Sequence, residues 1–333
     1  MRQNNYFIML FKALFFSVII ITTSSARAEL KVVTTIKPLY SLVANVMDGV
    51  GEPSLIIEGS TSPHSFTLKP SHAKLLEEAD LIFWVGEGIE TFMEGPLESI
   101  AKNAEVVEFM EVESIEKLKF REESIFGDHD DHDDHDDHEE HDDHDDHDDH
   151  DDHDDHEEHD DHDHAHGEFD AHIWLDPSNA KEMVHEIAHE LGDLDPANKD
   201  KYEANAEATI KALDELMNDV SQNINKDAKF VVFHDAYQYF EERFGVRAAG
   251  ALTLNTDVLP GAKQVADIQD VIKDKGINCI FSEPQFNPKI ISTIAEDTNI
   301  KTGVFDPLGA NITSDKELYF KLISNLSNQL KDC

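Results

Sequence analysis

Residues 128–166 repeat a three-residue unit, Asp-Asp-His, with a few Glu-Glu-His variants and no basic residue. A period of three matches neither an α-helix nor a β-strand, and the segment has almost no apolar side chain to bury, so we expect a disordered loop. An acidic run that serves only solvation needs no imidazole, whereas neutral imidazole binds Zn²⁺, Ni²⁺ and Cu²⁺, and carboxylates add weak electrostatic attraction. We therefore expect auxiliary weak metal sites at the fourteen histidines of this segment: His129, His132, His135, His138, His141, His144, His147, His150, His153, His156, His159, His162, His164 and His166.

Three of the six remaining histidines lie at junctions between expected elements. His64 follows a strand, His172 precedes a helix, and His234 ends an apolar strand. Ligands of open parallel sheets bind at the carboxyl ends of strands, so we expect His234, Glu283 and Asp306 to line one rim. Three imidazoles with an open or carboxylate fourth position form a tetrahedral zinc site. Taken singly, each histidine is also typical of a structural, hydrogen-bonded position, and the pattern alone leaves both interpretations open.

A second metal-binding pattern, H-E-x-x-H, occurs at residues 185–189. On a helix, His185 and His189 share a face and could hold Zn²⁺ while Glu186 activates water, as in zinc metalloproteases. The apolar residues of this helix form the expected buried stripe, however, which turns both histidines toward the polar side. No methionine turn of the kind that such proteases use follows the pattern. The protease remains an alternative of a different functional class.

Residues 1–28 have the pattern of a signal peptide. Arg2 and Lys12 supply the basic start, an apolar run follows at 13–21, and a small-x-small cleavage site ends at Ala28. A retained membrane anchor is the alternative, but the apolar run is shorter than the roughly 20 residues that a span needs. We therefore expect cleavage after Ala28 and an exported protein.

The chain is strongly acidic, with a formal net charge of −44. Residues 128–163 contribute 24 acidic residues and no basic one, and acidic residues still outnumber basic ones in the rest. This balance argues against nucleic acid or anionic lipid as a partner. The chain has two cysteines, Cys279 and Cys333. In an oxidising compartment such a pair usually forms a bridge, and two free thiols are the alternative.

The rest of the chain alternates expected strands and helices, which indicates an α/β protein of two lobes, each a mostly parallel sheet with flanking helices. Asp176-Pro177 and Asp195-Pro196 each pair a capping side chain with a proline at the first helical position, so two helices should start there. The second should continue to about Ile224 as a long rigid helix between the lobes. A capping box at 314–317 should start the last helix. The expected domains are a signal peptide (1–28), an N-terminal metal-binding lobe (29–194, with the loop 128–166), a linker helix (195–225) and a C-terminal metal-binding lobe (226–333).

Several motifs together resemble one family of transport proteins. They are GSTSPHSFTLKPS (59–71), ADLIFWVG (79–86), HIWL (172–175), FHDAYQYF (233–240), EPQF (283–286) and DPLG (306–309). With the His-Asp-rich segment, they resemble the periplasmic zinc-binding proteins of ABC uptake systems, the ZnuA type of the cluster A-I family. The resemblance implies two lobes with the ion in the cleft between them, and delivery of the ion to an ABC membrane permease with its cytoplasmic ATPase. It also implies a periplasmic monomer without a catalytic step.

The resemblance also assigns metal ligands. His64, His172 and His234 match the three zinc ligands of the family. Pro63 stands where some zinc members have a ligating glutamate, so the fourth position falls either to water or to Asp306, which matches an aspartate of the manganese and iron relatives. His234 replaces the carboxylate that is usual in the manganese branch, and nitrogen in place of oxygen favours Zn²⁺.

The same resemblance bears on the cysteines and on the choice of function. Cys279 and Cys333 fall where zinc members place a disulfide. Capture of Zn²⁺ for uptake is therefore the expected function. The alternatives are a manganese or iron binder of the same fold, the zinc metalloprotease, and a metal-buffering protein that depends on residues 128–166 alone.

Overall fold

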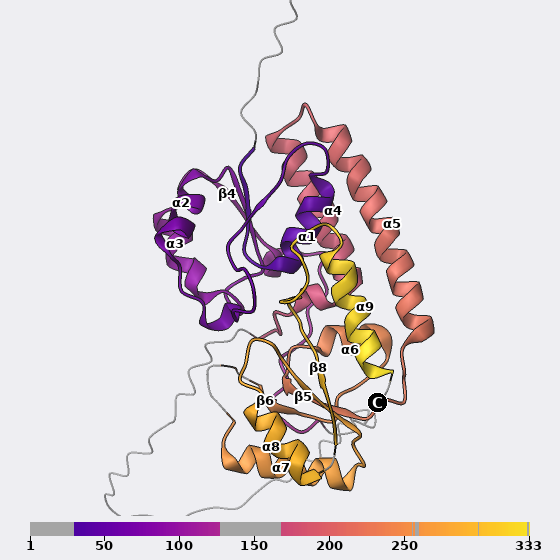
Figure 1. The fold of residues 1–333 in the computed structure, drawn as a ribbon. Coiled ribbons are helices and arrows are strands. Elements are labelled where there is room, and N and C mark those ends of the chain that lie inside the picture. The colour runs from indigo at the N-terminus through magenta and orange to yellow at the C-terminus, as the bar shows by residue number, and fades with distance from the viewer. Residues whose placement is uncertain (1–29, 127–167, 255, 257–259, 299, 332) are drawn as a thin grey trace, which may run out of the picture.

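The computed structural model describes residues 30–126, 168–254, 256, 260–298, 300–331 and 333, which fold into two lobes (Figure 1). The expected signal peptide and the His-Asp-rich segment lie outside the described residues. Each lobe contains a four-stranded parallel sheet with helices around it, as the sequence predicts. In the described part of the chain, no helix is both long enough and apolar enough to span a membrane.

The first lobe is built on a sheet of strand order β2-β1-β3-β4, in which every pair is parallel. Strands that helices cover on both faces are continuous apolar runs, and all four residues of β3 are buried. The strands are β1 (Val32–Thr34), β2 (Ser54–Leu55), β3 (Leu81–Trp84) and β4 (Glu105–Glu108). The α-helices are α1 (Lys37–Val46), α2 (Pro70–Glu78), α3 (Glu94–Ser99) and α4 (Pro177–Leu194). The 3₁₀ turns are η1 (Pro63–Ser65), η2 (Thr91–Met93), η3 (Phe109–Glu111) and η4 (Ile173–Leu175).

The second lobe repeats this plan with the strand order β6-β5-β7-β8, again parallel throughout. All five residues of β5 are buried, and its last residue is His234. The strands are β5 (Phe230–His234), β6 (Ala251–Thr253), β7 (Cys279–Ser282) and β8 (Lys301–Val304). The helices are α6 (Gln238–Phe244), α7 (Ala262–Asp274), α8 (Lys289–Thr298) and α9 (Leu318–Leu330).

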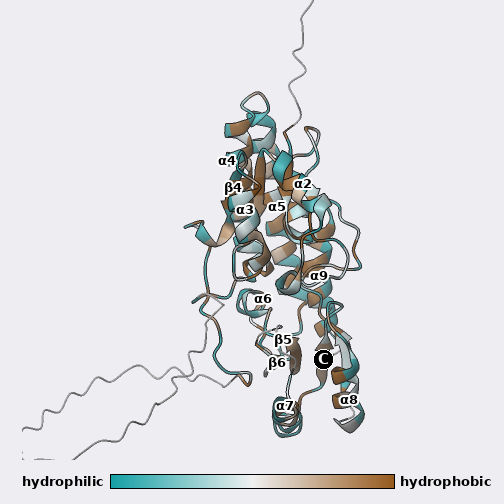
Figure 2. Cartoon of the chain, turned by 90° about the vertical axis from the view of Figure 1, so that its left-hand side faces the viewer, coloured by the Kyte–Doolittle hydropathy of each residue, from teal (hydrophilic) through white to brown (hydrophobic). Residues whose placement is uncertain are grey.

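The linker helix is α5 (Lys199–Asn223), which is 25 residues long and packs along α4. Figure 1 shows it on one side of the molecule, from the first lobe towards the second. The residues of α5 are of mixed hydropathy in Figure 2, as expected of a helix with one buried face. The expected start at Asp195-Pro196 is wrong. Asp195 is the C-cap of α4, and its carboxylate accepts hydrogen bonds from Asn198 and Tyr202 instead of capping a new helix.

The last helix, α9, joins the two lobes again because it packs against α1 and α5. It starts at Leu318, later than the expected capping box at 314–317 implies. The carboxylate of Asp315 accepts a hydrogen bond from the backbone N–H of Glu317 and so closes a turn before the helix. One buried apolar cluster includes residues of β1, β3, α4, α5, β5 and α9, so the two lobes share a core.

The chain also crosses to the second lobe just before residue 127. Backbone hydrogen bonds join Ala251 to Ser124 and Phe126 to Ala249, beside β6. A Cβ atom at Gly250 would lie 2.7 Å from the backbone oxygen of Ser124, so this close approach requires glycine. The last described residue before the expected loop therefore lies on the second lobe, although the sequence placed this loop within the first.

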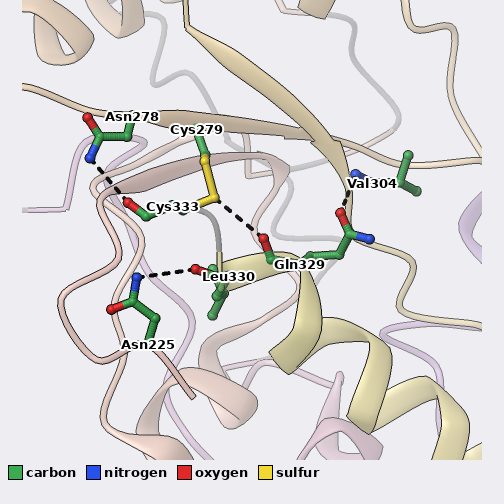
Figure 3. Close-up of a disulfide and its surroundings, with 7 residues drawn as sticks. All are labelled: Asn225, Asn278, Cys279, Val304, Gln329, Leu330 and Cys333. Carbon is green, nitrogen blue, oxygen red and sulfur yellow. Dashed lines mark hydrogen bonds between the residues drawn. A yellow bond between two sulfur atoms is a disulfide. The ribbon is translucent and has the colours of Figure 1, made fainter. Parts of the chain in front are cut away.

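The expected bridge between the two cysteines is present, and it ties the end of α9 to β7 (Figure 3). The side-chain amide of Asn278 donates a hydrogen bond to the backbone oxygen of Cys333, and Asn225 donates one to the backbone oxygen of Leu330. The C-terminal end of α9 is thus held covalently and by hydrogen bonds to the second lobe, while the helix also packs against α1 of the first lobe and against α5.

Candidate metal centre

His64, His172 and His234 converge between the lobes. One nitrogen of each ring lies within 4.8 Å of the corresponding nitrogens of the other two. The ring centroids are 5.5 Å apart for His64 and His172, 5.4 Å for His64 and His234, and 4.9 Å for His172 and His234. These separations allow all three imidazoles to reach one ion, since a Zn²⁺–N bond is about 2.0–2.1 Å long.

The local structure explains how each histidine reaches this point. His64 is the middle residue of η1, whose first residue is a proline, and His172 is the N-cap of η4. His234 ends β5 at the carboxyl edge of the second sheet, where ligands of parallel sheets bind. The first lobe therefore contributes two imidazoles and the second lobe contributes one. An ion bound by all three would therefore bridge the two lobes.

The three histidines differ in burial. His172 and His234 are each 3% exposed, whereas His64 is only half-buried. The residues that line a narrow pocket at the cluster include the three histidines, Pro63, Pro307 and Leu308. His64 is therefore the most exposed member of the cluster.

A buried carboxylate faces the imidazole of His172. The Nδ1 atom of His172 lies 2.7 Å from Oδ1 of Asp170, which also accepts the backbone N–H of His172. With Nδ1 directed at the carboxylate, Nε2 is the nitrogen left for an ion. Burial lowers the pKa of His172 below its ordinary value, although Asp170 opposes this shift. This shift favours the neutral ring, which is the form that binds metal.

A second buried carboxylate faces His234, at a longer distance. Its Nδ1 atom lies 3.5 Å from Oε2 of Glu283, which is 3% exposed. Burial alone would lower the pKa of His234, but Glu283 and more distant acids outweigh it and raise the pKa above its ordinary value. The other carboxylate oxygen of Glu283 has no hydrogen-bond partner among the described residues.

A third acid near the centre is already paired. Asp235, next to His234, lies 2.8 Å from the guanidinium of Arg121, which also pairs with Glu241 at 2.6 Å. Burial raises the pKa of Asp235 to about 7, although Arg121 opposes the shift. Arg121 comes from the segment that crosses between the lobes, so this ion pair supports β5 directly behind the cluster.

Asp306 follows β8 at the carboxyl end of the strand, and its carboxylate is engaged in hydrogen bonds. Oδ1 accepts hydrogen bonds from the backbone of Leu308 and Gly309 and from the side chain of Gln285, and Oδ2 accepts one from the backbone of Ala310. Both oxygens therefore stabilise the turn after β8. The group of metal-binding side chains found among the described residues contains the three histidines without Asp306.

The H-E-x-x-H pattern lies on α4 with its histidines at the surface. His185 and His189 are exposed, while Val184, Ile187, Ala188 and Leu191 form the buried face, as the sequence predicts. Nε2 of His189 lies 3.8 Å from Asp193 on the same helix. Within the described residues, these histidines join no group of three or more metal-binding side chains.

Two side chains near the centre, those of Asp170 and Trp174, were not predicted from the sequence to belong to it. Asp170 is two residues before His172, and a carboxylate at that short spacing was the available signal. Trp174 donates a hydrogen bond from Nε1 to the backbone oxygen of Pro307, 2.8 Å away, and its ring centroid lies 5.3 Å from that of His172. No local signal links Trp174 to Pro307, because the two residues are 133 positions apart.

Comparisons with known proteins agree on one family. The ZnuA model, zinc-uptake complex component A periplasmic, matches residues 32–333. The high-affinity zinc uptake system protein ZnuA of Brucella abortus (strain 2308) is 50% identical over 304 residues, which cover 91% of each chain.

Two solved structures share the fold at 22% identity. A crystal structure of ZnuA covers 90% of this chain and 98% of its own, with a TM-score of 0.69. The SBP FpvC of Pseudomonas aeruginosa in complex with Mn²⁺ covers 91% of this chain and 99% of its own, with a TM-score of 0.71. Since one of these proteins was solved with Mn²⁺, the fold by itself does not select the metal, and selection depends on the ligands.

Proposed function

The chain belongs to the ZnuA family of zinc-uptake components, and on this premise we propose that it captures Zn²⁺ outside the inner membrane and delivers it to an ABC-type permease. The permease and its cytoplasmic ATPase drive transport, so the protein itself performs no catalytic step. Residues 1–28 direct export to the periplasm and are removed after Ala28. The protein acts as a monomer.

One observation carries the proposal, namely the convergence of His64, His172 and His234 from two lobes. Three neutral nitrogen ligands suit Zn²⁺, whereas Mn²⁺ prefers oxygen ligands. The carboxylates of Asp170 and Glu283 are buried beside two of the imidazoles, and together they balance the charge of a divalent ion without bonding to it.

The fourth position is assigned to water in preference to Asp306. A bond from Asp306 to the ion would remove hydrogen bonds from the turn that holds Pro307 and Leu308. Water also exchanges without a change in the protein, which suits a carrier that must release its ion. Asp306 then contributes by holding this turn.

The domain boundaries follow from this assignment. Residues 29–194 and 226–333 are the two metal-binding lobes, and 195–225 is the linker between them. The histidines of 128–166 supply additional weak sites that raise the local zinc concentration. Phe126, the last described residue before this segment, is hydrogen-bonded to Ala249 of the second lobe.

Two alternative functions fit the described residues less well than zinc capture. A manganese or iron binder of the same fold would need an oxygen-rich site, and the three imidazoles argue against it. A metalloprotease at His185, Glu186 and His189 would need a third metal ligand, and among the described residues these two histidines join no group of three metal-binding side chains.

The test is a competitive titration with Zn²⁺ and Mn²⁺ on mature protein that lacks residues 128–166. We expect one tight Zn²⁺ site from which excess Mn²⁺ does not displace the ion, and the full mature chain should add several weaker sites. Tighter binding of Mn²⁺, or the absence of a tight Zn²⁺ site, would refute the assignment.

A further inference from the structure

Lys37 is a buried cation that the metal site does not use directly. It is the first residue of α1 in the first lobe and is 4% exposed. A buried ammonium is costly unless all its N–H groups find partners. Here Nζ donates to three backbone oxygens, at 2.6 Å to Gly309, 3.1 Å to Ala310 and 2.6 Å to Ile312. All three donors are thus directed at one loop of the second lobe.

This loop, residues 306–312, is fixed from two sides. On one side the carboxylate of Asp306 accepts backbone N–H groups of Leu308, Gly309 and Ala310. On the other side Lys37 binds the backbone oxygens. Gly309 has a φ of +68°, in the left-handed region that favours glycine, so the loop adopts a tight turn that exposes its carbonyl groups to Lys37.

The same loop forms one wall of the metal pocket. Pro307 and Leu308 line this pocket together with the three histidines. The backbone oxygen of Pro307 accepts the hydrogen bond from Nε1 of Trp174, which packs beside His172. Lys37 and Trp174 of the first lobe therefore hold a loop of the second lobe across the pocket.

We infer that Lys37 is a positioning residue that sets the rate of metal release, because it holds the loop 306–312 against the first lobe across the metal pocket. This inference rests on the proposed zinc-binding function. Without the ammonium, the three carbonyl groups lose their shared partner and the loop moves away from α1 more often. Each such opening lets water and competing ligands reach the ion. His64, the most exposed of the three histidines, lies outside this loop, so we expect the dissociation rate to change more than the association rate.

The test uses the full mature chain with Trp84→Phe, which leaves Trp174 as the one tryptophan of the chain. Stopped-flow fluorescence follows loss of Zn²⁺ from the site beside Trp174 after addition of excess chelator. Hydrogen exchange at the amides of Leu308, Gly309 and Ala310 in metal-free protein reports on the loop independently of zinc. Lys37→Met removes the ammonium, and Lys37→Gln keeps part of its donor capacity if the first variant folds poorly.

Lys316→Met is the matched control. Lys316 also crosses between the lobes, where it pairs with Asp48 at 2.7 Å, but its side chain is exposed and does not contact the loop. Lys37→Met should raise the dissociation rate about tenfold or more, with Lys37→Gln between it and the parent, since hydrogen bonds to a charged group are the stronger class. The association rate should stay within about twofold of the parent value, the three amides should exchange faster, and Lys316→Met should change none of these.

The outcomes separate this inference from the proposed function. If the dissociation rate is unchanged in both Lys37 variants, the inference about Lys37 is overturned. The proposed function is unaffected by that result as long as the parent protein has a tight Zn²⁺ site. An equal acceleration in Lys316→Met would also overturn the inference, because any lobe-crossing cation would then have the same effect. A parent chain without a tight Zn²⁺ site would overturn the proposed function and this inference together.

Discussion

The carboxylate of Asp170 holds His172 by two hydrogen bonds, one with Nδ1 of the imidazole at 2.7 Å and one from the backbone N–H at 3.0 Å. The carboxylate therefore fixes both the ring and the backbone that carries it. This pairing selects the tautomer that presents Nε2 to an ion and increases the basicity of the ring.

Asp170→Asn should weaken Zn²⁺ binding about 10- to 100-fold, the usual effect of losing a carboxylate that orients a ligand histidine. Glu283→Gln should weaken it less, because Glu283 lies 3.5 Å from His234 and also raises the pKa of that ring. Its removal reduces competition from protons and offsets part of the loss. Calorimetric Zn²⁺ affinities of the two variants at pH 7 check this order, and parental affinity in Asp170→Asn would contradict it.

Glu90 provides a test of stability against pH. Its side chain is buried and accepts hydrogen bonds from the backbone of Val85 and Gly86, and burial raises its pKa from 4.5 to about 7. Because the native state holds this proton more tightly than the unfolded chain, its stabilising contribution is complete below pH 4.5 and is lost as the pH rises to about 7. As the pH rises from 4.5 to about 7, the free energy of unfolding of the parent should therefore fall by roughly 3 kcal/mol relative to that of Glu90→Gln.

Urea unfolding of the parent and of Glu90→Gln at several pH values between 4.5 and 8 measures this difference. Glu98→Gln, at an exposed position on α3, controls for the loss of one charge. A difference between parent and Glu90→Gln that does not depend on pH would show that the folded protein does not raise the pKa of Glu90.

The bridge between Cys279 and Cys333 closes a loop over a sequence separation of 54 residues. In the chain-entropy model such a loop stabilises the fold by about 4 kcal/mol, so Cys279→Ser with Cys333→Ser should lose roughly that amount. The exported protein should give no alkylated thiol until it is reduced. Two alkylated thiols in the untreated native protein would refute the bridge.

Substitution of Glu186 distinguishes a zinc carrier from a zinc protease. A general base is indispensable to a zinc protease, whereas a helix-surface glutamate contributes only a few tenths of a kcal/mol. Glu186→Gln should therefore keep the parental zinc affinity and stability, and zinc-loaded parent protein should cleave no peptide library. Zinc-dependent cleavage that disappears in this variant would overturn the carrier assignment.

Local signals predicted most of the architecture. Apolar runs located the central strands, and Asp176-Pro177 marked the start of α4, where the aspartate accepts the backbone N–H of Ser178. The same signal failed at Asp195, because its carboxylate accepts hydrogen bonds from the side chains of Asn198 and Tyr202, three and seven residues later. The short elements β4, α3 and α6 were not predicted, since few residues carry their pattern.

The motifs predicted the histidine cluster, but they did not predict the residues that position the histidines and the loop beside them. Residues far apart in the sequence form these supports, as when Lys37 reaches Gly309 over 272 positions. The sequence also could not predict the role of Asp306, because a carboxylate at the end of a strand can either bind an ion or accept hydrogen bonds from the backbone of its own turn. Both carboxylate oxygens of Asp306 accept hydrogen bonds from backbone N–H groups of the turn.

The most direct measurement of the central claim is the Zn²⁺ affinity of His64→Ala, His172→Ala, His234→Ala and Asp306→Ala in mature protein that lacks residues 128–166. The background removes histidines that would otherwise mask a lost ligand. Each histidine variant should lose tight binding, because two imidazoles and water do not complete a strong tetrahedral site. Asp306→Ala should lose less, since its carboxylate acts through the turn. Parental affinity in any of the three histidine variants would contradict the assigned centre.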